Sequence, residues 1–143
     1  KEITTEGGLN LVKNIYKIKK IISKLKKVKI RSSLFVNPNI KDIILAKKLN
    51  SDCVELHTGK LSNMVKLKRN YQHELKKIKK SSIIAKSIGL EVHVGHGIDL
   101  KTAKILNTIK EITEFNIGHF IIGESIFYGL ASVIKKFRKI LNS

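Results

Sequence analysis

A histidine framed by glycines and a carboxylate inside an apolar run are the residues of this 143-residue sequence best suited to chemistry. His96 lies between Gly95 and Gly97, which leave a ligand room to approach both the backbone and the imidazole. Histidine is the side chain best placed to exchange protons near neutral pH. His96 is therefore a candidate proton donor or acceptor, although the pattern alone also fits a histidine in an ordinary glycine turn.

Glu55 and His57 stand two positions apart in the apolar run 53–57, so in a strand they would share one face. An isolated buried carboxylate is costly, and Glu55 must therefore be paired or point toward an open rim. A structural ion pair and a catalytic role are about equally compatible with this pattern. For His57 taken alone, a buried histidine with satisfied hydrogen bonds is the favoured interpretation.

Gly118-His119, near the end of the sequence, indicates an anion site, because backbone N–H groups at a glycine turn beside a helix start attract phosphate. Gly7-Gly8, just before a helical stretch, allows the same interpretation. A tight turn explains the first pair equally well, and a flexible lead into a helix explains the second.

Four β-rich runs, each followed by a loop and a helical stretch, must position these residues. The expected strands are 33–36, 53–57, 90–94 and 116–122, and the expected helices are 9–27, 40–49, 61–88, 99–110 and 124–141. Asp99 is expected to cap the fourth helix and Gly89 to end the third. Ligands gather at the C-terminal ends of parallel strands, so the candidate residues should line one rim.

This alternation predicts one α/β domain over residues 1–143, with a parallel sheet and right-handed crossovers. Periodicity does not separate a small open sheet from part of a (β/α)8 TIM barrel, which typically needs about 250 residues.

The sequence is strongly basic, with 29 Lys and Arg against 11 Asp and Glu and a formal net charge of +18. Only Arg31, Arg69 and Arg138 are arginines. This argues against a nucleic-acid partner, because bidentate recognition of phosphate and guanine favours arginine. The lysines spread along every helical stretch, as a compositional bias would place them.

Membrane spans and cysteine-based sites are also not expected. No uninterrupted apolar stretch reaches the roughly 18 residues that a membrane span needs. The single cysteine, Cys53, excludes an internal disulfide framework and a cysteine-rich metal site. We therefore expect a cytoplasmic protein without a membrane partner.

Several motifs, in this order and at compatible spacing, make the sequence similar to the pyridoxine 5′-phosphate synthase family. They are Thr4-Thr5-Glu6-Gly7-Gly8-Leu9, Ser33-Leu34-Phe35, Glu55-Leu56-His57-Thr58-Gly59, Gly95-His96-Gly97, Asn116-Ile117-Gly118-His119 and Ile121-Ile122-Gly123. The resemblance implies a (β/α)8 barrel that condenses 3-amino-2-oxopropyl phosphate with 1-deoxy-D-xylulose 5-phosphate. The products would be pyridoxine 5′-phosphate, phosphate and water, formed without a metal or an organic cofactor.

The resemblance also assigns roles. It implies that His96 is the catalytic proton donor and that Glu55 stabilises a transition state. It implies that Thr4 contacts the deoxyxylulose phosphate and that the aminooxopropyl phosphate is held by Gly97, Gly118 and His119. A homo-oligomer acting on small phosphorylated substrates is the expected assembly.

Two departures from the family pattern matter. A further catalytic histidine and glutamate of the family lie upstream of its threonine-threonine-glutamate-glycine-glycine segment, where this sequence begins. We therefore expect the last four βα units of the barrel with the helix before them, and no turnover by these 143 residues alone. Glu124-Ser125 replaces a basic and a small residue, and Glu124 would repel a phosphate unless it points away.

The alternative interpretation is a basic α/β module that binds phosphate or nucleic acid without catalysis. A decaying remnant is a third possibility, against which the intact rim residues argue.

Overall fold

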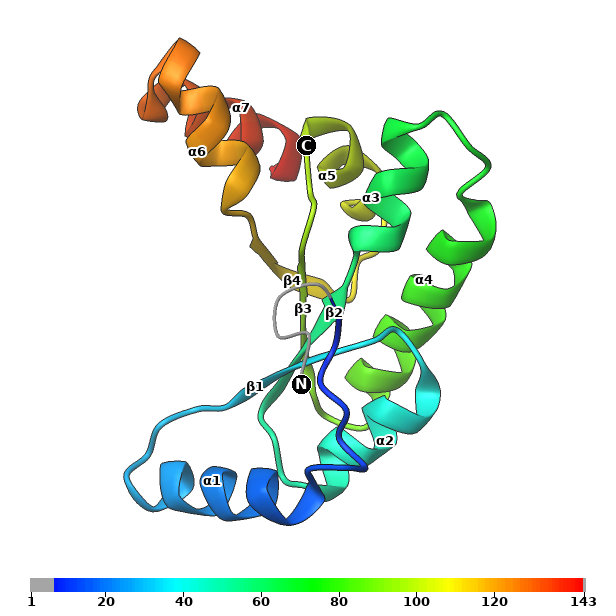
Figure 1. Cartoon of the computed structure of the whole chain (residues 1–143), viewed down its shortest axis with the longest axis vertical. Coiled ribbons are helices and arrows are strands. Elements are labelled where there is room, and N and C mark those ends of the chain that lie inside the picture. Colours follow the sequence, from blue (N-terminus) through cyan, green and yellow to red (C-terminus); the bar gives the residue numbers. More distant parts are fainter. Residues whose placement is uncertain (1–6, 143) are drawn as a thin grey trace.

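The computed structural model describes residues 7–142, which form an α/β fold around one parallel four-stranded sheet (Figure 1). The strands are paired in sequence order and comprise β1 (Ser33–Val36), β2 (Cys53–His57), β3 (Glu91–Gly95) and β4 (Ile112–Asn116). All three pairings are parallel, as the alternation of strands and helices predicted. The C-terminal ends of the four strands therefore meet at one edge of the sheet.

Seven helices lie within the described residues. They are α1 (Ile15–Lys27), α2 (Ile40–Lys48), α3 (Gly59–Lys66), α4 (Gln72–Ser87), α5 (Leu100–Leu106), α6 (His119–Tyr128) and α7 (Leu130–Leu141). None of the helices in this part of the chain is both long and apolar enough to cross a membrane.

The two faces of the sheet differ in chemistry, because strand side chains alternate between faces. One face is fully apolar at its centre and packs into the core with helix residues such as Ile43 and Ile78. Its buried strand residues are Leu34, Val36, Val54, Leu56, Val92 and Val94. The other face carries the polar strand residues Glu55, His57, His93, Glu114 and Asn116.

The expected helix ends at Asp99 and Gly89 are confirmed. Asp99 Oδ1 accepts a hydrogen bond from the backbone N–H of Thr102 at 2.7 Å and so caps α5. Gly89, just after the end of α4, has φ +74°, the left-handed conformation that commonly ends a helix. α5 itself ends at Leu106 instead of residue 110, and α1 begins at Ile15 instead of residue 9.

The expected single helix over 61–88 is wrong, because the structure divides it into α3 and α4. Lys68, between them, has φ +53°, which interrupts the helical path. The side chain of Asn70 then accepts a hydrogen bond from the backbone N–H of Gln72, where α4 begins. Local polar residues thus override the apolar spacing that suggested one long helix.

The expected fourth strand at 116–122 is also wrong. β4 ends at Asn116, and the apolar residues from His119 onward form α6. A short apolar run fits a strand or a buried helix equally well, and pairing with β3 selects the preceding segment instead. The expected helix 124–141 is likewise two helices, α6 and α7, separated at Gly129.

Candidate functional site at the C-terminal edge of the sheet

The backbone around His96 is fixed by Thr58, the residue that follows β2. The Thr58 side chain is fully buried, and its hydroxyl lies 2.7 Å from the carbonyl oxygen of Gly95 and 2.9 Å from that of His96. His96 has φ +79°, which is uncommon for a residue with a side chain, and Gly97 follows with φ +74°. Backbone held in this sparsely populated region is typical of functional sites.

The imidazole of His96 stacks on that of His57, with ring centroids 4.8 Å apart and an interplanar angle of 25°. Phe35 of β1 contacts His57 in turn, at 5.3 Å between centroids. Gly59 makes room for both imidazoles, because a Cβ there would lie 2.6 Å from Cδ2 of His96. His57, for which a buried structural role was favoured, is half-buried and supports the ring of His96.

Glu55 lies on the polar face of the sheet, and its carboxyl group leans toward the C-terminal edge. Its Oε2 accepts a hydrogen bond of 2.8 Å from Nδ2 of Asn116, at the end of β4. A Cβ on Gly95 would lie 1.9 Å from its Oε1, so only glycine fits beneath the carboxyl group. Glu55 thus has a hydrogen-bonded partner, but that partner is an amide and not a cation.

A hollow of about 620 Å³ lies between the loop after β3 and the start of α6. Four of the predicted site residues line it, namely His96, Gly97, Gly118 and His119. Gly118 and His119 lie at the N-terminus of α6, whose first turn has no side-chain cap. The N–H groups and dipole of a helix N-terminus attract anions, so this end of the hollow suits a phosphate.

Glu124 also lines this hollow, and the corrected helix start changes its position. It lies in the second turn of α6 instead of the first. The acidic group is therefore displaced from the N–H groups that would bind an anion.

A second hollow of about 780 Å³ lies beside the first and shares His96, Gly97 and Phe120 with it. Lys60 and Lys66 of α3 line it from the other side. His96 therefore stands between two hollows, one bordered by a helix N-terminus and one by lysines.

The remaining predicted residues are placed less completely. Thr4 lies outside the described residues. Gly8 passes close to the end of β1, where a Cβ would lie 2.4 Å from the backbone nitrogen of Asn37. Leu9 then donates a backbone hydrogen bond of 2.8 Å to Phe35. The described part of the first motif thus contacts the edge of the sheet that carries the site.

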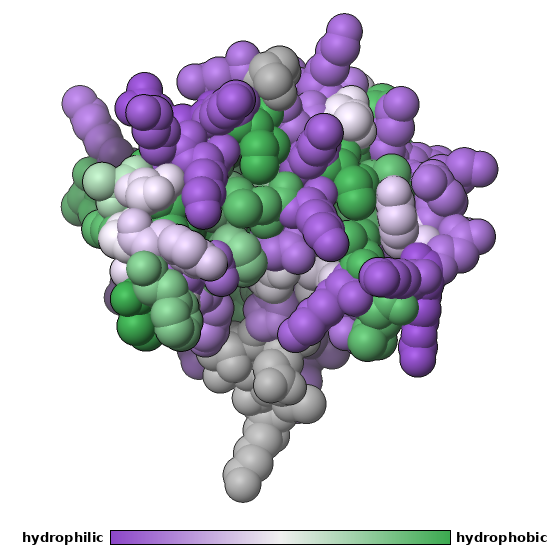
Figure 2. Space-filling model, turned by 90° about the horizontal axis from the view of Figure 1, so that it is seen from above, coloured by the Kyte–Doolittle hydropathy of each residue, from purple (hydrophilic) through white to green (hydrophobic). Residues whose placement is uncertain are grey.

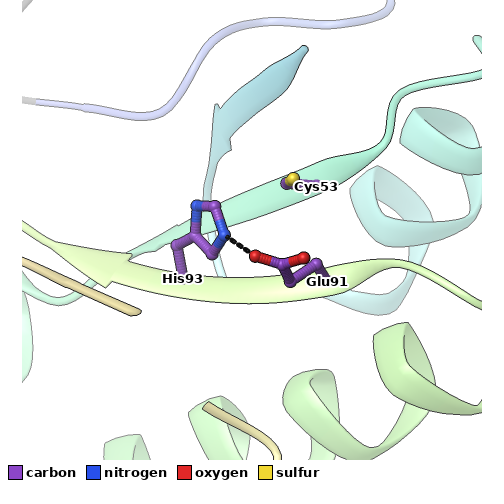
Figure 3. A group of neighbouring side chains, drawn as sticks. All are labelled: Cys53, Glu91 and His93. Carbon is purple, nitrogen blue, oxygen red and sulfur yellow. Dashed lines mark hydrogen bonds and ion pairs between the residues drawn. The ribbon is translucent and has the colours of Figure 1, made fainter. Parts of the chain in front are cut away.

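One group of side chains has the composition of a metal site. The possible ligand atoms of Cys53, Glu91 and His93 all lie within 4.8 Å of one another (Figure 3). Arg31 already contacts this group, because its guanidinium donates to Sγ of Cys53 at 3.1 Å and to Glu91 at 2.5 Å. Glu91 is also hydrogen-bonded to His93 at 2.8 Å.

The protonation states of Cys53 and Glu91 indicate what kind of group this is. Burial raises the pKa of the Cys53 thiol, which is therefore protonated near neutral pH. The hydrogen bonds from His93 and Arg31 lower the pKa of Glu91 and keep it charged. We interpret the group as an ion-pair network at the opposite end of the strands from His96, and assign no metal to it.

Sequence reasoning missed the roles of Thr58, Gly95 and Asn116. All three belong to motifs noted in the sequence, and each lies at or just after a strand end. Their contacts join separate strands, however, and no local pattern indicates which residues will meet across a sheet.

Comparison with known proteins identifies the family of this chain. The family model described as "Pyridoxal phosphate biosynthesis protein PdxJ" matches residues 1–143. Pyridoxine 5′-phosphate synthase of Pelagibacter ubique is 61% identical over 142 residues, which cover 99% of this chain and 59% of the relative. The synthases of Zymomonas mobilis and Sulfurihydrogenibium sp. are 42% and 40% identical and are covered to 55% and 57%.

The chain thus spans less than two thirds of the length of these curated relatives, while nearly all of it is matched. Residues of three of the motifs that carry the resemblance, namely Gly59, His96 and Gly118, line the two hollows at the C-terminal edge of the sheet. The chain belongs to the PdxJ family of pyridoxal phosphate biosynthesis proteins.

Proposed function

We propose that these residues are the C-terminal part of a pyridoxine 5′-phosphate synthase. The complete enzyme would condense 3-amino-2-oxopropyl phosphate with 1-deoxy-D-xylulose 5-phosphate to pyridoxine 5′-phosphate, phosphate and water. The observation that supports this most is that His96, Gly97, Gly118 and His119 line one hollow.

The sheet supports a half-barrel architecture. Its strands follow sequence order without reversal, as consecutive strands of a (β/α)8 barrel do. Its polar face carries Glu55 and His57, and a closed barrel would enclose this face as its interior. In this proposal the last four βα units are present, and the rest of the longer relatives supplies the other strands.

The proposed chemistry uses His96 and Glu55 in different ways. Ring closure with loss of water requires a proton for the departing oxygen, and His96 would donate it from its stacked position on His57. A carboxylate fixed beside the reacting atoms stabilises positive charge that develops in a transition state, which is the role we assign to Glu55.

Substrate binding would use the residues around both hollows. The N-terminus of α6, with Gly118 and His119, would hold the aminooxopropyl phosphate together with Gly97. Thr4 would contact the deoxyxylulose phosphate. These roles need no metal or organic cofactor, because the proposed steps are proton transfer and charge stabilisation.

Assembly is a further part of the proposal. Ile126 and Phe127 of α6 are 78% and 80% exposed, and apolar side chains this accessible support contact with further polypeptide. We assign a homo-oligomeric, cytoplasmic enzyme, as the resemblance implies.

The test uses a chain of full family length. The part of the Pelagibacter ubique synthase that residues 1–143 do not match is fused to the N-terminus of these residues. We call this protein the fused synthase. Release of phosphate and formation of pyridoxine 5′-phosphate from both substrates are then measured. We expect turnover by the fused synthase and its abolition by His96→Ala, with the unfolding transition retained.

His73→Ala is the matched control, because His73 is an exposed histidine on α4. It should leave turnover unchanged. A folded fused synthase that forms no product, or normal turnover by the His96→Ala variant, would contradict the proposal.

A further inference from the structure

The side chain of Glu55 reaches across a neighbouring strand to its partner. Glu55 is paired in register with His93 of β3, while Gly95 is paired with Asn116 of β4. The carboxyl group of Glu55, which belongs to β2, therefore crosses β3 at Gly95. It reaches the amide of Asn116 on β4. This contact links β2 directly to β4 at the C-terminal edge.

Both carboxyl oxygens are located by this arrangement. Oε2 accepts the 2.8 Å hydrogen bond from Asn116, and Oε1 lies 1.9 Å from the position that a Cβ of residue 95 would take. Because Gly95 has no side chain, the carboxyl group of Glu55 can cross β3 at this position. The hydrogen bond from the amide of Asn116 then holds the carboxyl group in place.

We infer that Asn116 is a positioning residue for Glu55 in the synthase reaction, an inference that rests on the proposed function. A carboxylate stabilises a transition state best when it is already held in place, so that it need not reorganise during the reaction. Asn116 lines the hollow together with His96, and its amide holds the carboxyl group of Glu55.

Asn116 itself lines that hollow, so a direct contact with substrate is the competing explanation. The two explanations differ in kinetics. A residue that orients Glu55 acts on the chemical step and changes kcat, whereas a residue that only binds substrate changes KM.

The experiment measures kcat and KM for both substrates in the fused synthase. We expect Asn116→Ala to lower kcat about 10- to 100-fold, the range for loss of a hydrogen bond to a charged group, with each KM within about twofold of the parent. The same substitution in a Glu55→Gln background should cause no further loss, because the group it positions is already altered.

Asn116→Asp gives an independent readout through pH. The substitution keeps the shape but replaces the donor by a carboxylate that repels Glu55. Its kcat relative to the parent should rise as the pH falls, because the introduced carboxyl group becomes a donor when protonated. A purely structural role would not produce this pH profile.

Asn107→Ala is the control, because Asn107 donates a side-chain hydrogen bond of 3.0 Å to the carbonyl of Ile140, away from the site. It should leave kcat and both KM values unchanged. Circular dichroism and thermal unfolding confirm that each variant is folded.

The outcomes distinguish failure of the proposed synthase function from failure of the role assigned to Asn116. An inactive but folded parent contradicts the proposed function itself. An active parent with unchanged kcat in Asn116→Ala, an effect confined to KM, or a full further loss in the Glu55→Gln background overturns the role of Asn116 alone.

Discussion

Among single residues, Gly95 matters to the site because a larger residue there would clash with the carboxyl group of Glu55. A Cβ at this position would lie 1.9 Å from Oε1 of Glu55, so Gly95→Ala must displace the carboxyl group or the strand. We expect the kcat of this variant of the fused synthase to fall about tenfold or more, because a displaced carboxylate no longer stabilises the transition state. We also expect it to unfold at a lower temperature. An unchanged melting temperature together with normal kcat would contradict this packing.

Glu74 is a second residue with a measurable effect, in this case on stability. Its side chain is only 5% exposed and pairs with Lys60 at 3.0 Å and with Lys77 at 3.3 Å. Burial raises its pKa, but the hydrogen bonds and charges of the two lysines outweigh burial, and the pKa lies below the ordinary 4.5. Because the folded-state pKa is lowered, the stabilisation is present above pH 4.5 and is lost as the pH falls through the folded value.

Glu74→Gln should therefore reduce the free energy of unfolding of the fused synthase by about 1 kcal/mol at pH 7, because both lysine partners are partly exposed to solvent. The difference from the parent should shrink as the pH is lowered below about 4.5, where the parent also loses the charge. Urea unfolding across this pH range measures it. Glu111→Gln is the control, since Glu111 forms no ion pair among the described residues. A difference that stays constant with pH would contradict the ion-pair origin.

The sequence was sufficient to locate His96, Gly97, Gly118 and His119 at one rim, because parallel strands end at the same edge. It was not sufficient to find the bond between Glu55 and Asn116, which are 61 positions apart. That contact depends on the register of two strand pairs and on the space above Gly95. These are properties of the folded sheet and leave no local pattern.

At the scale of secondary structure, Gly129 separates α6 from α7. Its φ of +75° and ψ of +143° lie in a region that residues with a Cβ avoid. Gly129→Ala should therefore lower the free energy of unfolding of the fused synthase by about 1–3 kcal/mol.

Gly123→Ala offers a matched control within α6, because a Cβ there meets no atom within 4 Å. It should be neutral or stabilising by up to about 1 kcal/mol, since alanine is the better helix former. Chemical denaturation of both variants measures the difference. Equal effects of the two substitutions would mean that the backbone at Gly129 is not constrained.

Element boundaries were predictable where composition and fold agree. β1 and β2 have the expected limits, because each is a short β-rich run between clear loops. The sequence misplaced β4, because the residues of β4 are mixed in polarity and three of the five are exposed, whereas the following Phe120-Ile121-Ile122 looks more like a buried strand. Pairing with β3 selects residues 112–116 as the strand. No local sequence pattern indicates this pairing.

Across the whole molecule, lysines occur in every described helix except α6. Figure 2 shows hydrophilic side chains projecting on several sides of one face, with apolar groups between them. Hydrophilic and apolar groups are thus interspersed on the face seen. The apolar residues that remain exposed include Ile122, Ile126, Phe127, Tyr128 and Leu130 of α6 and α7.

The described sheet has two edges that are not paired with a further strand. β1 and β4 are the outer strands of the described sheet, and an unpaired strand edge is a template for pairing with another chain. In a closed barrel both edges would be paired and the polar face enclosed. The 143 residues alone should therefore self-associate with increasing concentration, whereas the fused synthase should form one assembly whose size does not change.

Sedimentation velocity of both proteins over a range of concentrations measures this difference. Hydrogen exchange supplies the structural readout, because amides of β1 and β4 should be protected more strongly in the fused synthase than in the short chain. Amides of β3 serve as the internal reference, since β3 is paired on both sides in the sheet itself. A short chain that stays monomeric, with both outer strands as protected as β3, would contradict the half-barrel architecture and favour an independent open-sheet domain.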